Sequence, residues 1–214
     1  MTHPRDIGFT AAALPEFGPI LKSWLELQVR YRRLSGQDDV TWIYGERASL
    51  SILAAAAWHS GGIALEEFST DKKPIVKGSE LPIDTSAHGR CDLFISIRGR
   101  DFLIEAKPSW PSLRGEAKAR VAKTLGVATA DARRTSTYSG ARRLAAVLVA
   151  PHLPRAHAAD STRLVRQFVT DLESFPGCAA AWFFPSATRQ FSLVNDGKSY
   201  PGAAVLIKAL RRAS

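Results

Sequence analysis

The sequence has little cysteine and no long apolar run. Its 214 residues include two cysteines, Cys91 and Cys178, which lie far apart. Their spacing matches neither a disulfide framework nor a zinc site, so we expect reduced thiols and a cytoplasmic protein. No apolar stretch approaches the roughly 20 residues that a transmembrane helix needs, and the first residues lack the basic and then apolar layout of a signal peptide. We therefore expect no membrane partner.

Several well-known functional motifs are also missing from the sequence. It contains no Walker loop, no GxSxG and no Gly-rich dinucleotide fingerprint, which argues against NTPases, esterases and oxidoreductases. Positive charge, in contrast, is in excess. With 29 Lys and Arg against 20 Asp and Glu, the formal net charge is +9. Such an excess attracts polyanions and makes nucleic acid a candidate partner, although many basic proteins bind none.

The order of apolar patterns predicts the fold class. Helical spacing is found over residues 15–33, 42–59 and 113–135, and again from residue 160; strand-like runs cover 63–72, 89–110, 142–151 and 178–185. Strands that alternate with helices indicate an α/β protein with a central mixed β-sheet flanked by helices. We expect a single domain over residues 1–214, with 1–40 as an N-terminal helical extension and 42–185 as the core.

The stretch "GRCDLFISIRGRDFLIEAKPSW" predicts a β-hairpin with acids at its open end. Its apolar runs flank Arg98-Gly99, which suits a two-residue turn because glycine accepts a positive φ. With that turn, Asp92 lies opposite Glu105. Strand alternation then places Asp92, Glu105 and Lys107 on one face and leaves the other face apolar, as expected of the side facing the core.

Two carboxylates opposite each other destabilise a sheet unless a cation compensates them. A divalent metal is the strongest such cation, and Mg²⁺ binds through one or two carboxylates together with water and phosphate oxygens. It would activate a water and neutralise charge on a phosphate, while Lys107 orients the water or stabilises the transition state. The other interpretation is a solvated strand edge with a local ion pair that blocks aggregation. The residues alone leave both open.

The pattern of Asp92 on one strand and Glu105-Ala106-Lys107 on the next resembles the PD-(D/E)xK nuclease superfamily, which has the restriction-endonuclease-like fold. That superfamily often adds an acid from a preceding helix, and Glu46 in "WIYGERASLSILAAAAW" stands at the matching position. The sequence departs from the superfamily's pattern in two places, the proline of the PD motif and a Gln that one branch of the superfamily carries. Cys91 replaces the proline, and "DARRTSTYSG" lacks the Gln of the exonuclease-like branch.

The resemblance implies a Mg²⁺-dependent phosphodiesterase, with Mn²⁺ as a substitute and an endonuclease favoured over an exonuclease. It implies that Asp92, Glu105, the carbonyl of Ala106 and Glu46 bind the metal. Lys107 would assist the attacking water, so the catalytic set is Glu46, Asp92, Glu105 and Lys107.

Basic residues on the helix after the hairpin are candidates for binding nucleic acid. They are Arg114, Lys118, Arg120 and Lys123. Such residues either follow phosphates or form a solvated helix face, and the sequence leaves both open. We expect DNA as the substrate, with RNA possible, and a homodimer or a partner protein as the source of specificity. The alternative is a catalytically silent nucleic-acid-binding or protein-interaction module of the same fold.

Overall fold

A computed structural model of the protein describes residues 6–72, 87–136, 140–193 and 197–210. Its centre is a seven-stranded mixed sheet with the strand order β1-β7-β9-β5-β4-β3-β2. The strands are β1 (Ile7–Thr10), β2 (Ile63–Lys72), β3 (Ala87–Ile97), β4 (Arg100–Ser109), β5 (Arg142–Val149), β7 (Cys178–Phe183) and β9 (Ala203–Ala209). Two short strands, β6 (Leu153–Pro154) and β8 (Lys198–Ser199), pair separately. The α/β class and the mixed sheet are as the sequence predicts.

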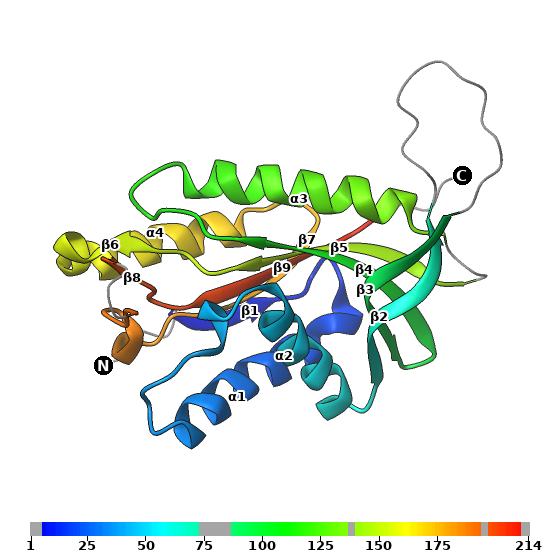
Figure 1. The fold of residues 1–214 in the computed structure, drawn as a ribbon, viewed down its shortest axis with the longest axis horizontal. Helices are drawn as coiled ribbons and strands as arrows, with labels where there is room; N and C mark the ends of the chain where they lie inside the picture. Colours follow the sequence, from blue (N-terminus) through cyan, green and yellow to red (C-terminus); the bar gives the residue numbers. More distant parts are fainter. Residues whose placement is uncertain (1–5, 73–86, 137–139, 194–196, 211–214) are drawn as a thin grey trace, which may run out of the picture.

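Four helices cover the two faces of the sheet. They are α1 (Gly18–Leu34), α2 (Glu46–His59), α3 (Ala117–Arg134) and α4 (Ser161–Glu173). Helices α1 and α2 pack on one face, and α3 and α4 pack on the other (Figure 1). Among the described strands, β4 and β5 are parallel and are joined through α3, whereas the other ladders are antiparallel. Within the described ranges, no helix combines the length and the apolar character needed to cross a membrane.

Most predicted elements are present, and the differences have local causes. Helix α2 begins at Glu46 rather than Trp42, because Trp42 lies in a 3₁₀ turn and Gly45 takes a φ of 90°. Strand β5 is buried along most of its length, as its continuous apolar run predicts. The sheet also includes β1 and β9, which lie outside residues 42–185. Helix α1 belongs to the same core, to which it contributes Trp24 among other residues.

The β3–β4 hairpin has the register that its turn predicts. The ladder runs from the Leu93–Ile104 pair to the Ile97–Arg100 pair. Arg98 and Gly99 have φ values of 52° and 70°, as the two central residues of a type I′ turn require. The face expected to be apolar packs against α1 and α2; its residues are Leu93, Ile95, Ile97, Phe102, Ile104 and Ala106.

The opposite face of the hairpin is less polar than strand alternation alone indicates. Phe94 and Leu103 are buried on that side together with Cys91 and Ala141. The ring of Phe94 stacks on Phe68 of β2, with 4.9 Å between the ring centroids. The hairpin is therefore buried on both faces near its middle, and its charged residues gather at the open end.

Candidate active site at the open end of the hairpin

The site begins where β3 leaves β4. The β3–β4 ladder stops at the Leu93–Ile104 pair, one position short of Asp92. There, Oδ2 of Asp92 accepts a hydrogen bond of 2.7 Å from the main-chain N–H of Ala106. A side-chain carboxylate thus satisfies a backbone donor that a regular ladder would pair with a carbonyl. This bond fixes Asp92 beside the main chain that joins Glu105 to Lys107.

The strand on the other side of Asp92 is irregular as well. The β2–β3 register pairs Glu66 with Leu93 and Phe68 with Cys91, and it skips Glu67 and Asp92. Glu67 takes a φ of 53°, a left-handed conformation that is uncommon for a residue with a side chain. The pairs on either side keep the same register, so the ladder is distorted here without an inserted residue. Asp92 therefore lies at a break in both of its neighbouring ladders.

Glu105 is buried, and its carboxylate is fully engaged by neighbouring side chains. The residue is 1% exposed. Lys72 Nζ lies 2.8 Å from Oε1 and 2.9 Å from Oε2, and the hydroxyl of Thr135 donates a 2.7 Å hydrogen bond to Oε1. Burial raises the pKa of Glu105, and the charge of Asp92 adds to this, although Lys72 and Thr135 oppose it. The ionised carboxylate therefore depends on a nearby cation.

Lys107 is held by an acid on helix α3. Its Nζ lies 3.0 Å from Oδ2 of Asp131, and Arg134 lies 3.8 Å from the other oxygen of Asp131. Burial alone would lower the pKa of Lys107, but the hydrogen bond to Asp131 and the charges of Asp92, Asp131 and Glu105 raise it. Lys107 is consequently a protonated ammonium at neutral pH and acts as a fixed positive charge.

Glu46 contributes a third carboxyl from the other face of the sheet. It is the first residue of α2 and follows Gly45, whose positive φ turns the chain into the helix. Burial raises the pKa of Glu46, and the charge of Asp92 raises it further, while Lys107 opposes the shift. The charges of both Asp92 and Lys107 thus act on Glu46.

The donors at this site are of the kind that Mg²⁺ or Mn²⁺ prefers. Carboxylates of Asp92, Glu105 and Glu46 and the carbonyl of Ala106 are hard oxygen ligands. The raised pKa values of Glu46 and Glu105 reflect burial and repulsion from Asp92, which a bound cation would relieve. In the part of the chain that the structure describes, no three His, Cys, Asp or Glu side chains are grouped closely enough to hold a metal ion. A metal would have to share Glu105 with Lys72.

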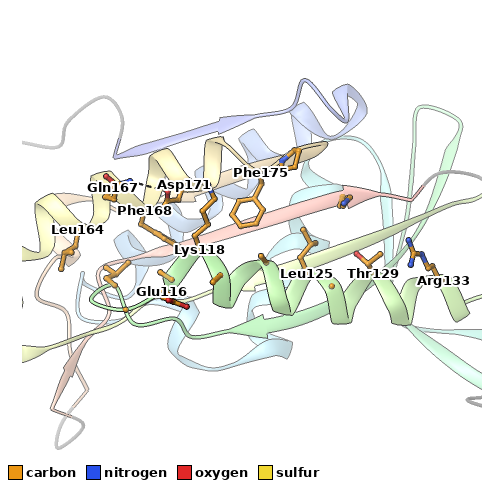
Figure 2. Close-up of a pocket in the computed structure, with 18 residues that line it drawn as sticks. Glu116, Lys118, Leu125, Thr129, Arg133, Leu164, Gln167, Phe168, Asp171 and Phe175 are labelled. Carbon is orange, nitrogen blue, oxygen red and sulfur yellow. Dashed lines mark hydrogen bonds between the residues drawn. The ribbon is translucent and has the colours of Figure 1, made fainter. Parts of the chain in front are cut away.

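Of the four basic residues predicted on the helix after the hairpin, Lys118, Arg120 and Lys123 lie on α3 and extend away from this site, whereas Arg114 lies in a turn because α3 begins at Ala117 rather than at residue 113. Arg120 and Lys123 are exposed, Arg114 contacts His157, and Lys118 donates a 2.8 Å hydrogen bond to Ser174. Figure 2 shows Lys118 between α3 and α4, in a groove with a volume of about 830 Å³ and a mostly apolar lining. At about 1.5 Å per residue, Lys118 lies roughly 20 Å along α3 from Asp131, which is at the site.

Sequence reasoning missed three residues that contact the predicted set. Lys72 and Thr135 bind Glu105, and Asp131 binds Lys107. The sequence carried one weak signal: Asp131 is an acid on the helix that immediately follows the Glu-Ala-Lys strand. Lys72 reaches Glu105 from 33 positions away, and no local pattern indicates such a contact.

The open end of the hairpin therefore brings together Asp92, Glu105 and a protonated Lys107, and the charges of Asp92 and Lys107 also act on Glu46 at the start of α2. Three of these side chains have a defined contact: Asp92 with Ala106, Glu105 with Lys72 and Thr135, and Lys107 with Asp131. A comparison of the chain with family models, with curated proteins and with solved structures finds no match.

Proposed function

We propose that the protein is a metal-dependent nuclease that hydrolyses phosphodiester bonds, with DNA as its substrate. The observation that carries the proposal is the arrangement of two carboxylates and an ammonium at one main-chain point. Asp92 binds the N–H of Ala106, and Glu105 and Lys107 are the residues on either side of Ala106. The resemblance to the PD-(D/E)xK nucleases and the net charge of +9 support the same function.

Asp92, Glu105, the carbonyl of Ala106 and Glu46 would hold Mg²⁺ or Mn²⁺. When bound, the metal lowers the pKa of a coordinated water and neutralises charge on the phosphate. Lys107, kept protonated by Asp131, stabilises negative charge that develops on the phosphate oxygens. Glu46, the first residue of α2, would serve as a further metal ligand or orient the attacking water.

The substrate class follows from charge. A net charge of +9 favours a phosphate polymer, and the exposed Arg120 and Lys123 on α3 suit contacts with its backbone that do not read sequence. RNA offers the same phosphates and is the alternative substrate. A homodimer would supply the two sites needed to cut both strands of a duplex, and a partner protein is the other source of specificity.

One observation favours a second candidate, a catalytically silent module that binds nucleic acid or protein. Lys72 already neutralises Glu105 through contacts of 2.8 Å and 2.9 Å. A site whose buried acid is paired in this way is stable without a metal. Catalytic assays separate the two candidates.

The test is cleavage of linear and circular duplex DNA, single-stranded DNA and RNA by the purified protein in Mg²⁺ or Mn²⁺. We expect cleavage of DNA, and we expect Glu105→Ala and Lys107→Ala to lower the rate by at least about a hundredfold. Circular dichroism of both variants checks that the fold is kept. Lys22→Ala, an exposed lysine on α1, is the matched control and should cleave normally. Failure of the wild type to cut any substrate with either metal contradicts the proposal.

A further inference from the structure

Lys72 forms the shortest ion pair at the candidate site, and neither the sequence pattern nor the nuclease comparison assigns it a role. It is the last residue of β2, the edge strand of the sheet. Its ammonium contacts both carboxylate oxygens of Glu105, at 2.8 Å and 2.9 Å. The side chain of Glu105 is 2% exposed and that of Lys72 is 22% exposed. Water therefore has little access to this pair from the Glu105 side.

The aliphatic stem of Lys72 is also held in place, by contact with the main chain of β3. A Cβ atom added to Gly89 would lie 2.8 Å from Cγ of Lys72 and 3.0 Å from its Cδ, so the stem crosses directly over the Gly89 main chain. Lys72 also forms a β-bridge with Thr135, and the N–H of Ser136 donates a 2.8 Å hydrogen bond to the carbonyl of Asp71. The end of β2 is thus hydrogen-bonded to the segment after α3, and Glu105 contacts a residue of each segment, Lys72 and Thr135.

A divalent cation and Lys72 need the same oxygens. Mg²⁺ binds carboxylate oxygens at about 2.0–2.1 Å, so a metal on Glu105 would lie roughly 5 Å or less from an ammonium in its present position. The charges have the same sign, and the buried surroundings of Glu105 screen them poorly. Lys107 does not compete in this way, because Asp131 holds its ammonium.

We propose that Lys72 is a built-in competitor for the metal: its ammonium occupies Glu105 and must be displaced before a divalent cation binds there. The inference rests on the proposed function and concerns the affinity of the same site. Lys72 then sets the concentration of divalent metal at which the site fills. The catalytic residues themselves keep their roles.

The experiment is calorimetric titration with Mn²⁺ alone, at pH 8, without nucleic acid. Lys72→Met keeps most of the stem and removes the charge, and it should bind Mn²⁺ at least about tenfold more tightly than the wild type, since a charged hydrogen bond no longer has to be broken. Gly89→Ala keeps the charge but displaces the stem, and it should give a smaller gain in affinity. Lys72→Arg restores a competing cation and should bind close to the wild type, as should the control Lys22→Met.

A second measurement covers the case in which Lys72→Met folds poorly. Mn²⁺ should raise the Tm of Gly89→Ala by more than it raises that of the wild type, because the metal replaces an ion pair that the variant has already weakened. Equal or weaker Mn²⁺ binding by Lys72→Met and Gly89→Ala, with binding by the wild type intact, overturns the inference and leaves the metal site standing. Absence of Mn²⁺ binding by the wild type and by every variant removes the metal site and the inference together.

Discussion

Ionised carboxylates at the two ends of the β3–β4 hairpin have opposite effects on the stability of the fold. At the turn end, Glu16 lies between Arg100 and Arg142, and the guanidinium of Arg142 also lies over the Phe102 ring, 6.0 Å from its centroid. Burial would raise the pKa of Glu16, but its main-chain hydrogen bond, the hydrogen bond from Arg100 and the charges of both arginines lower it. One acid there has two cations, and its ionisation stabilises the fold.

At the open end, acids outnumber the cations that hold them. The pKa of Glu46 and that of Glu105 are both raised, first by burial and then by repulsion from Asp92. Ionisation of these groups opposes folding, whereas ionisation of Glu16 favours it. Groups whose pKa values are shifted by burial and by like charges are typical of functional sites. Ionisation of Glu16 at the turn end therefore stabilises the fold, whereas ionisation of Glu46 and Glu105 at the open end opposes it.

Truncation of the core at the turn end should give the largest effect on stability. Phe102 is fully buried and packs edge-to-face on Phe17, with ring centroids 5.0 Å apart. Phe102→Ala should lower the free energy of unfolding by about 3–5 kcal/mol in a urea titration. Lys107→Ala at the open end should cost less than about 1 kcal/mol, because the ion pair it breaks is partly exposed. Equal losses of stability from both substitutions would contradict this difference between the two ends of the hairpin.

Removal of the charge of Glu16 should have an intermediate effect that depends on pH. The pKa of Glu16 is lower in the folded state than in the unfolded state. Its contribution to stability is therefore fully present above the unfolded-state pKa and is lost as the pH falls through the folded-state pKa. Glu16→Gln should cost about 1 kcal/mol at neutral pH, since Arg100 is largely exposed and its share is screened by water. Urea midpoints of the two proteins should converge in acid; a constant difference at every pH would contradict this cause.

Removal of the charge of Glu46 should give the smallest effect, of opposite sign. Its pKa is higher in the folded state, so the folded protein holds more protons in the window above the unfolded value, and stability falls as the pH rises through that window. Glu46→Gln should raise the Tm at neutral pH by an amount worth less than about 1 kcal/mol. Below the unfolded pKa, where wild-type Glu46 is protonated, the two melting curves should coincide. A lower Tm at neutral pH would show that the charge of Glu46 stabilises the fold.

Local rules account for what the sequence predicted correctly. Turn chemistry at Arg98-Gly99 fixed the register of the hairpin, and strand alternation fixed which face meets α1 and α2. The same rules placed Asp92 opposite Glu105, whereas in the structure the carboxylate of Asp92 binds the N–H of Ala106. The break in the ladder that permits this bond has no counterpart in the alternation of apolar residues.

Contacts between distant segments were beyond the reach of these rules. Thr135 and Lys72 meet at Glu105 because the end of β2, which is separated from β4 by β3, forms a bridge with the segment after α3 in the completed fold. The place of β9 between β5 and β7 is likewise a property of the whole sheet. A buried apolar run such as Arg142–Val149 indicates a strand with two neighbours, but the pattern does not identify those neighbours.

The pairing of β1 with β7 has a consequence for the order of folding. Strand β1, in which Ile7 pairs with Phe183, must wait until β7 has been synthesised before its partner exists. The β3–β4 hairpin needs only a two-residue turn and can form while synthesis continues. Since non-local pairings close slowly, the local hairpin with its acidic end should form early, and the attachment of the N-terminal strand should be a late step.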